Sequence, residues 1–218
     1  MQISIRRRYS WAVLPAREEA QIQRVPDRPA SNFFRWDHAR RQEAACLPRN
    51  LGRQLGLYVR SPVDIKLHPI DAIEFACEDE DLDAIKQKLG LVETWRRDSM
   101  YLGFRDHTAY RQFEFRVGDH FETMFVPNGG STLEWRLGFD LDAPEATGVL
   151  SCPLEDQSAF SMMYGYLPPS SLRRMNAGPG FSIAIDVHRP VAIKRGDLLG
   201  RLIPLPTSAF KFDYDFTE

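Results

Sequence analysis

Short segments of alternating apolar and polar residues follow one another from residue 91 to residue 205. This alternation is typical of half-buried strands. Turn-forming sequences interrupt it, including NGG at 128–130, NAGPG at 176–180 and KRGD at 194–197. Many short strands at this spacing are typical of antiparallel sandwiches and barrels. We therefore predict an α+β, mainly β fold: an antiparallel β-sandwich or jelly-roll-like barrel with one or two short helices.

Two segments carry helical signals. Residues 80–89 have acids in the first turn, apolar residues at Leu82, Ile85 and Leu89, and Gly90 as a C-terminal stop. Residues 37–46 form the second, shorter candidate, with Asp37 as the N-cap. We expect Pro48 to end this helix, because proline disfavours helical geometry in the residue before it.

The first part of the chain differs in composition from the rest. Residues 1–60 contain 12 Arg, no Lys and 5 acids, a net charge of +7 in a chain whose total is −2. Residues 1–36 are also rich in proline, so we expect an extended Arg/Pro-rich N-terminal arm there and a single mainly β domain over 37–218. The arginines are dispersed, which disfavours nucleic acid binding. They could bind a protein partner or pack against acidic surface of the chain itself.

The sequence also bears on location. It has no run of about 18 apolar residues and no apolar stretch near its start long enough for a signal peptide. We therefore expect a cytoplasmic protein without a membrane segment. Three widely spaced cysteines argue against a disulfide framework and against a Cys-x-x-Cys metal site.

His120 and Glu122 raise the question of a metal site. A His-x-acid pair followed by a distant histidine, here His188, is typical of Fe(II)/2-oxoglutarate oxygenases, whose facial triad leaves positions open for substrate and oxygen. Residues i and i+2 of a strand share a face, so His120 and Glu122 could hold one ion together. Fe(II) bound by His120, Glu122 and His188 is therefore one candidate site.

The hairpin around residue 118 decides whether that pair is available. With a two-residue loop, Val117 faces His120 and Phe115 faces Glu122, among apolar neighbours. With a three-residue loop that includes His120, Arg116 faces Glu122 across the strands, a favourable charge pair. We predict the three-residue loop, because it separates the apolar and polar faces more consistently.

Serines and arginines gather between residues 168 and 180, where they could grip an anion. Ser170-Ser171, Ile185-Asp186 and Gly196-Asp197-Leu198 resemble segments of the trimeric dUTPase and dCTP-deaminase family. The resemblance implies contacts of the serines with phosphates and of Asp186 with sugar and water. It covers about 35 residues and departs from the family: no Arg directly precedes Ser170, the gap from Asp186 to Gly196 is too short, and no glycine-rich C-terminal arm appears.

A second resemblance spans both ends of the domain. Cys46-Leu47-Pro48, Gly56-Leu57, Pro62 and Gly196-Asp197 with Ile203-Pro204 are similar to segments of an uncharacterised family of bacterial proteins of unknown function. The resemblance implies a bacterial protein and assigns neither an activity nor catalytic residues.

These observations favour a cytoplasmic bacterial enzyme or binding protein that acts on a small, anionic molecule through a reaction left open. We expect Asp186 and His188 as catalytic residues. The expected substrate-binding residues are Arg136, Tyr164, Tyr166, Ser170, Ser171 and Arg173. Two alternatives remain: the Fe(II)-dependent oxygenase, and a non-catalytic interaction or regulatory protein that uses the basic residues 1–60.

Overall fold

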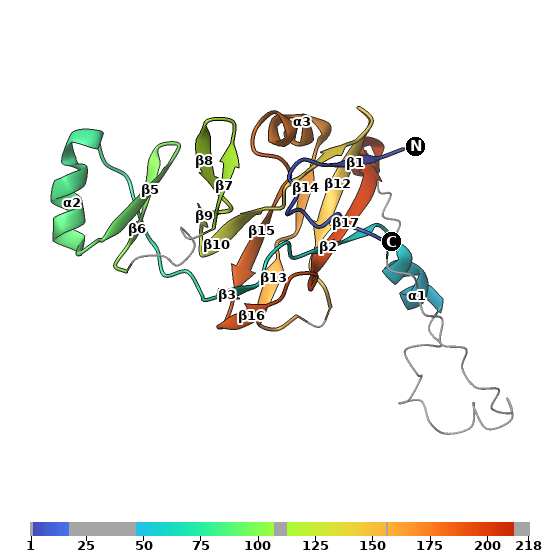
Figure 1. Ribbon diagram of the computed structural model, residues 1–218, viewed down its shortest axis with the longest axis horizontal. Helices are drawn as coiled ribbons and strands as arrows, with labels where there is room; N and C mark the ends of the chain where they lie inside the picture. The colour runs from blue at the N-terminus through green and yellow to red at the C-terminus, as the bar shows by residue number, and fades with distance from the viewer. Residues whose placement is uncertain (1, 18–46, 107–112, 156, 212–218) are drawn as a thin grey trace, which may run out of the picture.

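A computed structural model of the chain describes residues 2–17, 47–106, 113–155 and 157–211 (Figure 1). Its strands are β1 Ser4–Arg7, β2 Leu57–Arg60, β3 Ile65–Leu67, β4 Ile73–Phe75, β5 Glu93–Arg97, β6 Met100–Phe104, β7 Glu114–Val117, β8 His120–Thr123, β9 Phe125–Gly129, β10 Thr132–Arg136, β11 Phe139–Asp142, β12 Thr147–Cys152, β13 Phe160–Met162, β14 Gly165–Leu167, β15 Ser182–Val187, β16 Val191–Ile193 and β17 Leu198–Pro206. Its helices are α1 Leu47–Gln54, α2 Leu82–Leu89 and α3 Pro169–Ala177, with 3₁₀ turns at η3 Asp79–Asp81 and η5 Thr207–Phe210.

Two four-stranded antiparallel sheets form the centre of the molecule. One has the order β13-β15-β10-β9 and the other β14-β12-β17-β2. Each strand turns alternate side chains inward, so Trp135 and Ile185 of the first sheet share one fully buried core with Leu199 and Leu202 of the second. The prediction of an α+β, mainly β, sandwich-like fold is confirmed.

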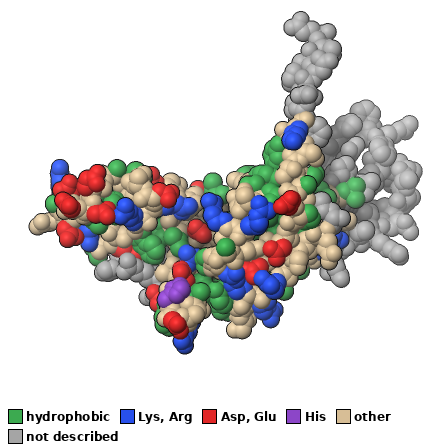
Figure 2. All heavy atoms as spheres, turned by 90° about the horizontal axis from the view of Figure 1, so that it is seen from above, with side chains coloured by type: hydrophobic (Ala, Val, Ile, Leu, Met, Phe, Trp, Pro, Cys, Tyr) green, Lys and Arg blue, Asp and Glu red, His purple; other side chains and the backbone are tan. Residues whose placement is uncertain are grey.

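A smaller sheet lies at one end of the molecule (Figure 1). It has the order β4-β6-β5, and α2 lies beside it. Figure 2 shows acidic side chains gathered over this end, which also contains the acidic first turns of the helix. A hydrogen bond from the Gly130 backbone N–H to the Glu74 carboxylate joins the smaller sheet to the turn between β9 and β10.

The opening residues pack on the sandwich. Strand β1 pairs with β11, from Ser4 opposite Asp142 to Arg7 opposite Phe139. Trp11 then lies against Gly138, where a side chain would meet the indole ring. This part of the predicted N-terminal arm is therefore attached to the domain, and residues 18–46 lie outside the described part of the chain.

The helices agree with the sequence only in part. Helix α2 spans Leu82–Leu89, and Gly90 ends it in the left-handed conformation (φ 66°), as predicted. The candidate helix at 37–46 lies outside the described residues. The expectation that Pro48 ends that helix falls on the same residues; Pro48 itself lies within α1. The third helix, α3, was not predicted.

No helix among the described residues combines the length and the apolar character needed to cross a membrane.

Candidate functional site

The hairpin of β7 and β8 has a two-residue turn. Val117 lies opposite His120 and Phe115 opposite Glu122, so the predicted three-residue loop is wrong. Gly118 occupies the first turn position with φ 58°, as a type II′ turn requires. Arg116 therefore does not face Glu122; its Nε donates to the Gly118 carbonyl at 2.9 Å.

Glu122 can occupy the face of buried Phe115 because it finds other partners there. Arg136 of β10 donates through Nη1 to Glu122 Oε2 at 2.5 Å and to the Thr123 carbonyl at 2.9 Å. His120 Nε2 lies 3.2 Å from Glu122 Oε1. Burial by itself would raise the pKa of Glu122, but the hydrogen bond and charge of Arg136, helped by His120, outweigh it and lower that pKa.

His188 lies far from this pair. Arg136, which contacts Glu122, is opposite Ser182 at the start of β15, and His188 follows the end of that strand. Six residues of strand span about 20 Å. The three-ligand site of His120, Glu122 and His188 is therefore not formed, and no group of three or more potential metal ligands occurs within the described ranges.

Asp186 and His188 lie together on the outer face of the first sheet, as the sequence led us to expect. His188 Nδ1 is 3.8 Å from Asp186 Oδ2. Its other nitrogen, Nε2, is 3.1 Å from the hydroxyl of Ser161 on the neighbouring strand β13. Ser131 donates to the other oxygen of Asp186 at 3.4 Å.

The other expected substrate-binding residues do not join them. Ser170 and Ser171 stand in the first turn of α3, with Arg173 exposed one residue beyond Leu172. Tyr164 is 75% exposed in the turn between β13 and β14.

Tyr166 and Arg136 are engaged elsewhere. The Tyr166 ring packs on Phe210, with ring centroids 4.4 Å apart. The Arg136 guanidinium is committed to the β8 hairpin through Glu122. The expected residues thus fall in separate places and do not line one pocket.

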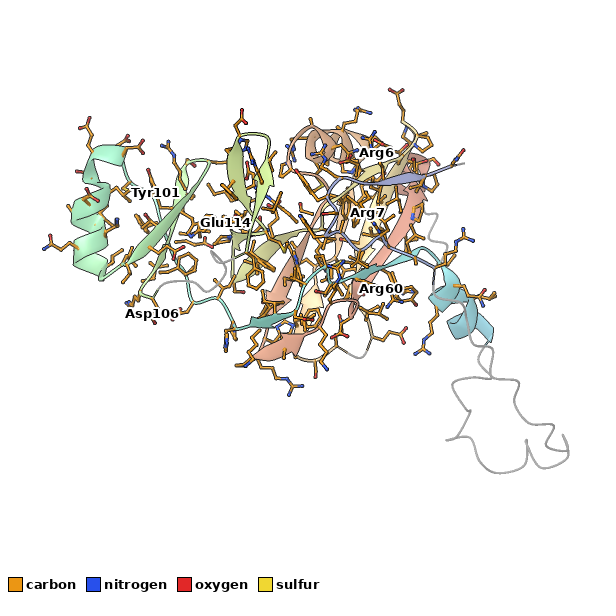
Figure 3. The ribbon with its side chains drawn as sticks, in the orientation of Figure 1. Arg6, Arg7, Arg60, Tyr101, Asp106 and Glu114 are labelled. Atoms are coloured by element: carbon orange, nitrogen blue, oxygen red, sulfur yellow. The ribbon has the colours of Figure 1, made fainter. Side chains whose placement is uncertain are left out.

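A pocket of about 300 Å³ is lined by residues of α1, β2, β17 and the loop after β12. Figure 1 shows α1 and β2 at the end of the molecule away from α2. Arg60, labelled in Figure 3, lies on β2 two residues after the lining residue Tyr58. The lining residues are Arg53, Tyr58, Leu154, Glu155, Gln157, Leu198 and Arg201. Two guanidinium groups beside a phenol ring and an amide suit an anion that also carries an apolar part.

Arg201 is held in place from two sides. Its Nη1 donates to the Gly52 carbonyl in the last turn of α1 at 2.7 Å, and its guanidinium carbon lies 5.9 Å from the centre of the Tyr58 ring. Tyr58 is opposite Arg201 in the β2–β17 pairing, and its hydroxyl donates to the Arg53 carbonyl at 2.9 Å. The helix end, the phenol and the guanidinium therefore form one fixed wall.

The rest of the wall is polar but less tightly held. Arg53, 44% exposed, forms a 3.8 Å ion pair with Glu155. Gln157 donates through Nε2 to the Leu198 carbonyl at 2.7 Å, which leaves its Oε1 as a buried acceptor without a hydrogen-bond partner. Cys152 lies opposite Arg201 across the β12–β17 pairing; burial raises the pKa of its thiol, against the opposing effect of the Arg201 charge.

Sequence reasoning missed this pocket for a physical reason. Arg201 and Tyr58 alternate with the inward-facing Leu202 and Val59, so each reads as an ordinary outward residue of a strand. Helix α1, which covers that outward face, was not expected at 47–54. The alternation in β17 was the available signal that Arg201 points away from the core.

No protein-family model matches the chain, and no match is found among the curated proteins with which it was compared.

Proposed function

We propose that the chain binds a small anionic molecule in the pocket lined by Arg53 and Arg201. The observation that carries this proposal is the fixed guanidinium of Arg201, which the Gly52 carbonyl and the Tyr58 ring hold at the pocket wall. A pre-oriented guanidinium binds carboxylate or phosphate oxygens through two parallel hydrogen bonds and loses little side-chain freedom in doing so. We place this function in the bacterial cytoplasm.

The pocket limits the size and shape of the ligand. A volume of about 300 Å³ is at the lower end of the range for small-molecule sites. Leu154 and Leu198 supply apolar lining, so the ligand combines one anionic group with a short apolar body. Glu155 disfavours a second anionic group near Arg53, which favours a ligand with a single carboxylate or phosphate group over one with several.

Binding can be tested by isothermal titration calorimetry with inorganic phosphate, phenyl phosphate and benzoate. We expect at least one aromatic anion to bind more tightly than inorganic phosphate, because it also fills the apolar part of the pocket. Arg201→Lys keeps the charge but loses the bidentate fork and should weaken binding by about 10-fold. Arg53→Gln should weaken it less, and Arg7→Gln, on exposed β1, should leave it unchanged.

Arg53→Gln also tests whether a loss of binding comes from unfolding, because the Arg53 side chain is 44% exposed and its ion pair with Glu155 is long, at 3.8 Å. Equal affinity of the original chain, Arg201→Lys and Arg53→Gln for all three anions would overturn the proposal, as would no measurable binding.

The basic residues 1–60 could instead bind a protein partner. For some of their arginines, contacts within the chain itself are a competing explanation. Arg6 and Arg8 both contact the buried carboxylate of Asp140, at 2.9 Å each. Arg60 donates to the Gly196 carbonyl at 2.9 Å. These contacts favour self-packing for the arginines concerned, so small-molecule binding is the proposal we retain.

A further inference from the structure

Ser161, His188 and Asp186 form a line of three groups that the anion pocket does not use. Ser161 Oγ lies 3.1 Å from His188 Nε2, and His188 Nδ1 lies 3.8 Å from Asp186 Oδ2. One imidazole nitrogen thus meets a hydroxyl and the other a carboxylate. This is the order in which a histidine can accept a hydroxyl proton while a carboxylate stabilises the imidazolium that results.

The strand pairing fixes this arrangement. Ser161 and Asp186 lie directly opposite each other in the β13–β15 pairing, so their side chains leave the same face of the sheet. His188 is two residues beyond Asp186 and is held by its backbone N–H, which donates to the Ala159 carbonyl at 2.9 Å. The imidazole therefore spans the two strands above the sheet.

The edge position of β13 adds hydrogen-bond donors beside the serine. Within the described part of the chain, β13 is the outermost strand of its sheet. Two backbone hydrogen bonds connect it to β15: the His188 N–H donates to the Ala159 carbonyl, and the Met163 N–H donates to the Ala184 carbonyl. In an antiparallel ladder the intervening residues direct their N–H groups away from the partner strand, so the N–H of Met162 points outward next to Ser161. When Ser161 attacks an ester, the substrate carbonyl oxygen becomes negative and could accept a hydrogen bond from this N–H.

We propose that Ser161 is a nucleophile toward carboxylic esters, with His188 as its general base and Asp186 as a positioning residue. In the first step the bond from Ser161 Oγ to the ester carbon forms, the bond to the alkoxide oxygen breaks, and the serine proton passes through His188 Nε2 to the departing alcohol. Water then attacks the acyl-serine, releases the acid and returns the proton to Ser161.

An ester fits this site better than an amide. An amine leaves only when it is protonated, which demands a well-stabilised imidazolium. Asp186 is 3.8 Å from the imidazole and His188 is 45% exposed, so this stabilisation is weak. An alkoxide leaves with less help from an acid. The inference is independent of the anion pocket, because it uses the opposite sheet and shares no residue with it.

Diisopropyl fluorophosphate tests the nucleophile directly. Ser161 Oγ would attack phosphorus, the O–P bond would form as the P–F bond breaks, fluoride would leave, and the hydroxyl proton would pass to His188. We expect one adduct per folded chain in the intact mass, located on Ser161 by peptide mapping. Ser161→Ala should abolish it. Ser158→Ala is the matched control, since Ser158 precedes the same strand and contacts Arg189 at 2.5 Å.

Two further variants test whether His188 activates the Ser161 hydroxyl or whether the hydroxyl reacts only because it is exposed. His188→Gln should slow labelling by about 100-fold, the usual effect of removing a general base. Asp186→Asn should slow it by less, because Asp186 acts through the imidazole. Thermal unfolding curves establish that each variant is folded. An adduct elsewhere, no adduct, or equal labelling rates in the original chain and in folded His188→Gln would overturn the proposal.

Discussion

Gly138 shows how one residue fixes the packing of the chain's opening segment. Its φ of 76° lies in the left-handed region, and an added Cβ would lie 2.5 Å from Cη2 of Trp11. Trp11 in turn packs on Tyr9 and Phe115, with ring centroids 5.4 Å and 5.1 Å away. The indole ring therefore has little room to move away from a methyl group at this position.

Gly138→Ala should lower the free energy of unfolding by about 2–4 kcal/mol, from the left-handed backbone and the clash together. Gly118→Ala is the control, because Gly118 has φ 58° but open space around its Cα. It should cost only the backbone part, about 1–2 kcal/mol. Urea denaturation of both variants measures the difference. Equal decreases in the free energy of unfolding of the two variants would show that Trp11 moves to make room for the added methyl group.

Glu122 makes stability depend on pH. Its pKa is lowered in the folded chain, because Arg136 and His120 outweigh the effect of burial. A carboxyl whose folded pKa lies below its unfolded value, about 4.3, stabilises the fold above that value. This contribution is lost as the pH falls through the folded pKa.

The free energy of unfolding of Glu122→Gln should therefore lie below that of the original chain at pH 7. The two should converge as the pH falls below about 4. Chemical denaturation at a series of pH values measures the gap. Glu114→Gln, at an exposed position of β7 in the same hairpin (Figure 3), is the control for replacing a carboxylate by an amide. A constant gap at all pH values would mean that Glu122 acts by packing and not by its charge.

Among the elements, α3 depends on one side chain for its attachment to β11. Asn176 Nδ2 donates to the Leu141 carbonyl at 3.1 Å and to Asp142 Oδ1 at 2.8 Å, and its Oδ1 accepts from the Leu141 N–H at 3.2 Å. The amide thus takes the place of a neighbouring strand for Leu141. Leu172, buried at 2% exposure, supplies the apolar contact of the helix.

Asn176→Ala should lower the free energy of unfolding by about 2 kcal/mol, because it leaves both backbone groups of Leu141 without partners. Arg173→Ala, on the exposed face of the same helix, should change it by less than about 0.5 kcal/mol. Thermal and urea unfolding of both variants tests this. A loss for Asn176→Ala no larger than that for Arg173→Ala would show that water replaces the amide.

Elements with a regular alternation of apolar and polar residues could be predicted from the sequence. Elements whose position depends on tertiary contacts could not. The two-residue alternation of β15 and β17 predicted strands, and Gly90 predicted the end of α2. Helix α3 was missed because residues 168–180 were interpreted only as a possible anion-binding segment, although proline is favoured at a helix start. The β7–β8 register was wrong because Arg136, the partner that makes the inward position of Glu122 tolerable, lies 14 residues away.

The candidate site illustrates the same limit. The proximity of Asp186 and His188 follows from their spacing on one strand face, and the sequence predicted it. Ser161 comes from a neighbouring strand 27 residues away, so no local pattern pointed to it. The anion pocket requires α1 to cover β2 and β17, which only the folded chain shows.

At the scale of the whole molecule, contacts between residues far apart in the sequence attach the opening segment to the rest of the chain. Asp140, 2% exposed, meets Arg6 and Arg8 from the opening segment. Arg8 also donates to the carbonyls of Asn176 and Gly178 at the end of α3. Arg8 therefore joins the opening residues both to the buried Asp140 of β11 and to the end of α3.

The two proposed sites lie on two different faces of this sandwich. The outer face of the β13-β15-β10-β9 sheet carries Ser161, Asp186 and His188. The outer face of the other sheet, under α1, carries Tyr58 and Arg201. On the second of these faces we propose that a small anion binds to a guanidinium that the fold holds in place.

The most direct measurement is an NMR titration that follows the Nε–Hε signals of the arginine side chains while phenyl phosphate is added. We predict a saturable shift of the Arg201 signal and a smaller saturable shift of Arg53. The signal of Arg7, exposed on β1 (Figure 3), should change only linearly with ionic strength. Uniform, non-saturating changes at all three arginines would contradict anion binding at Arg201.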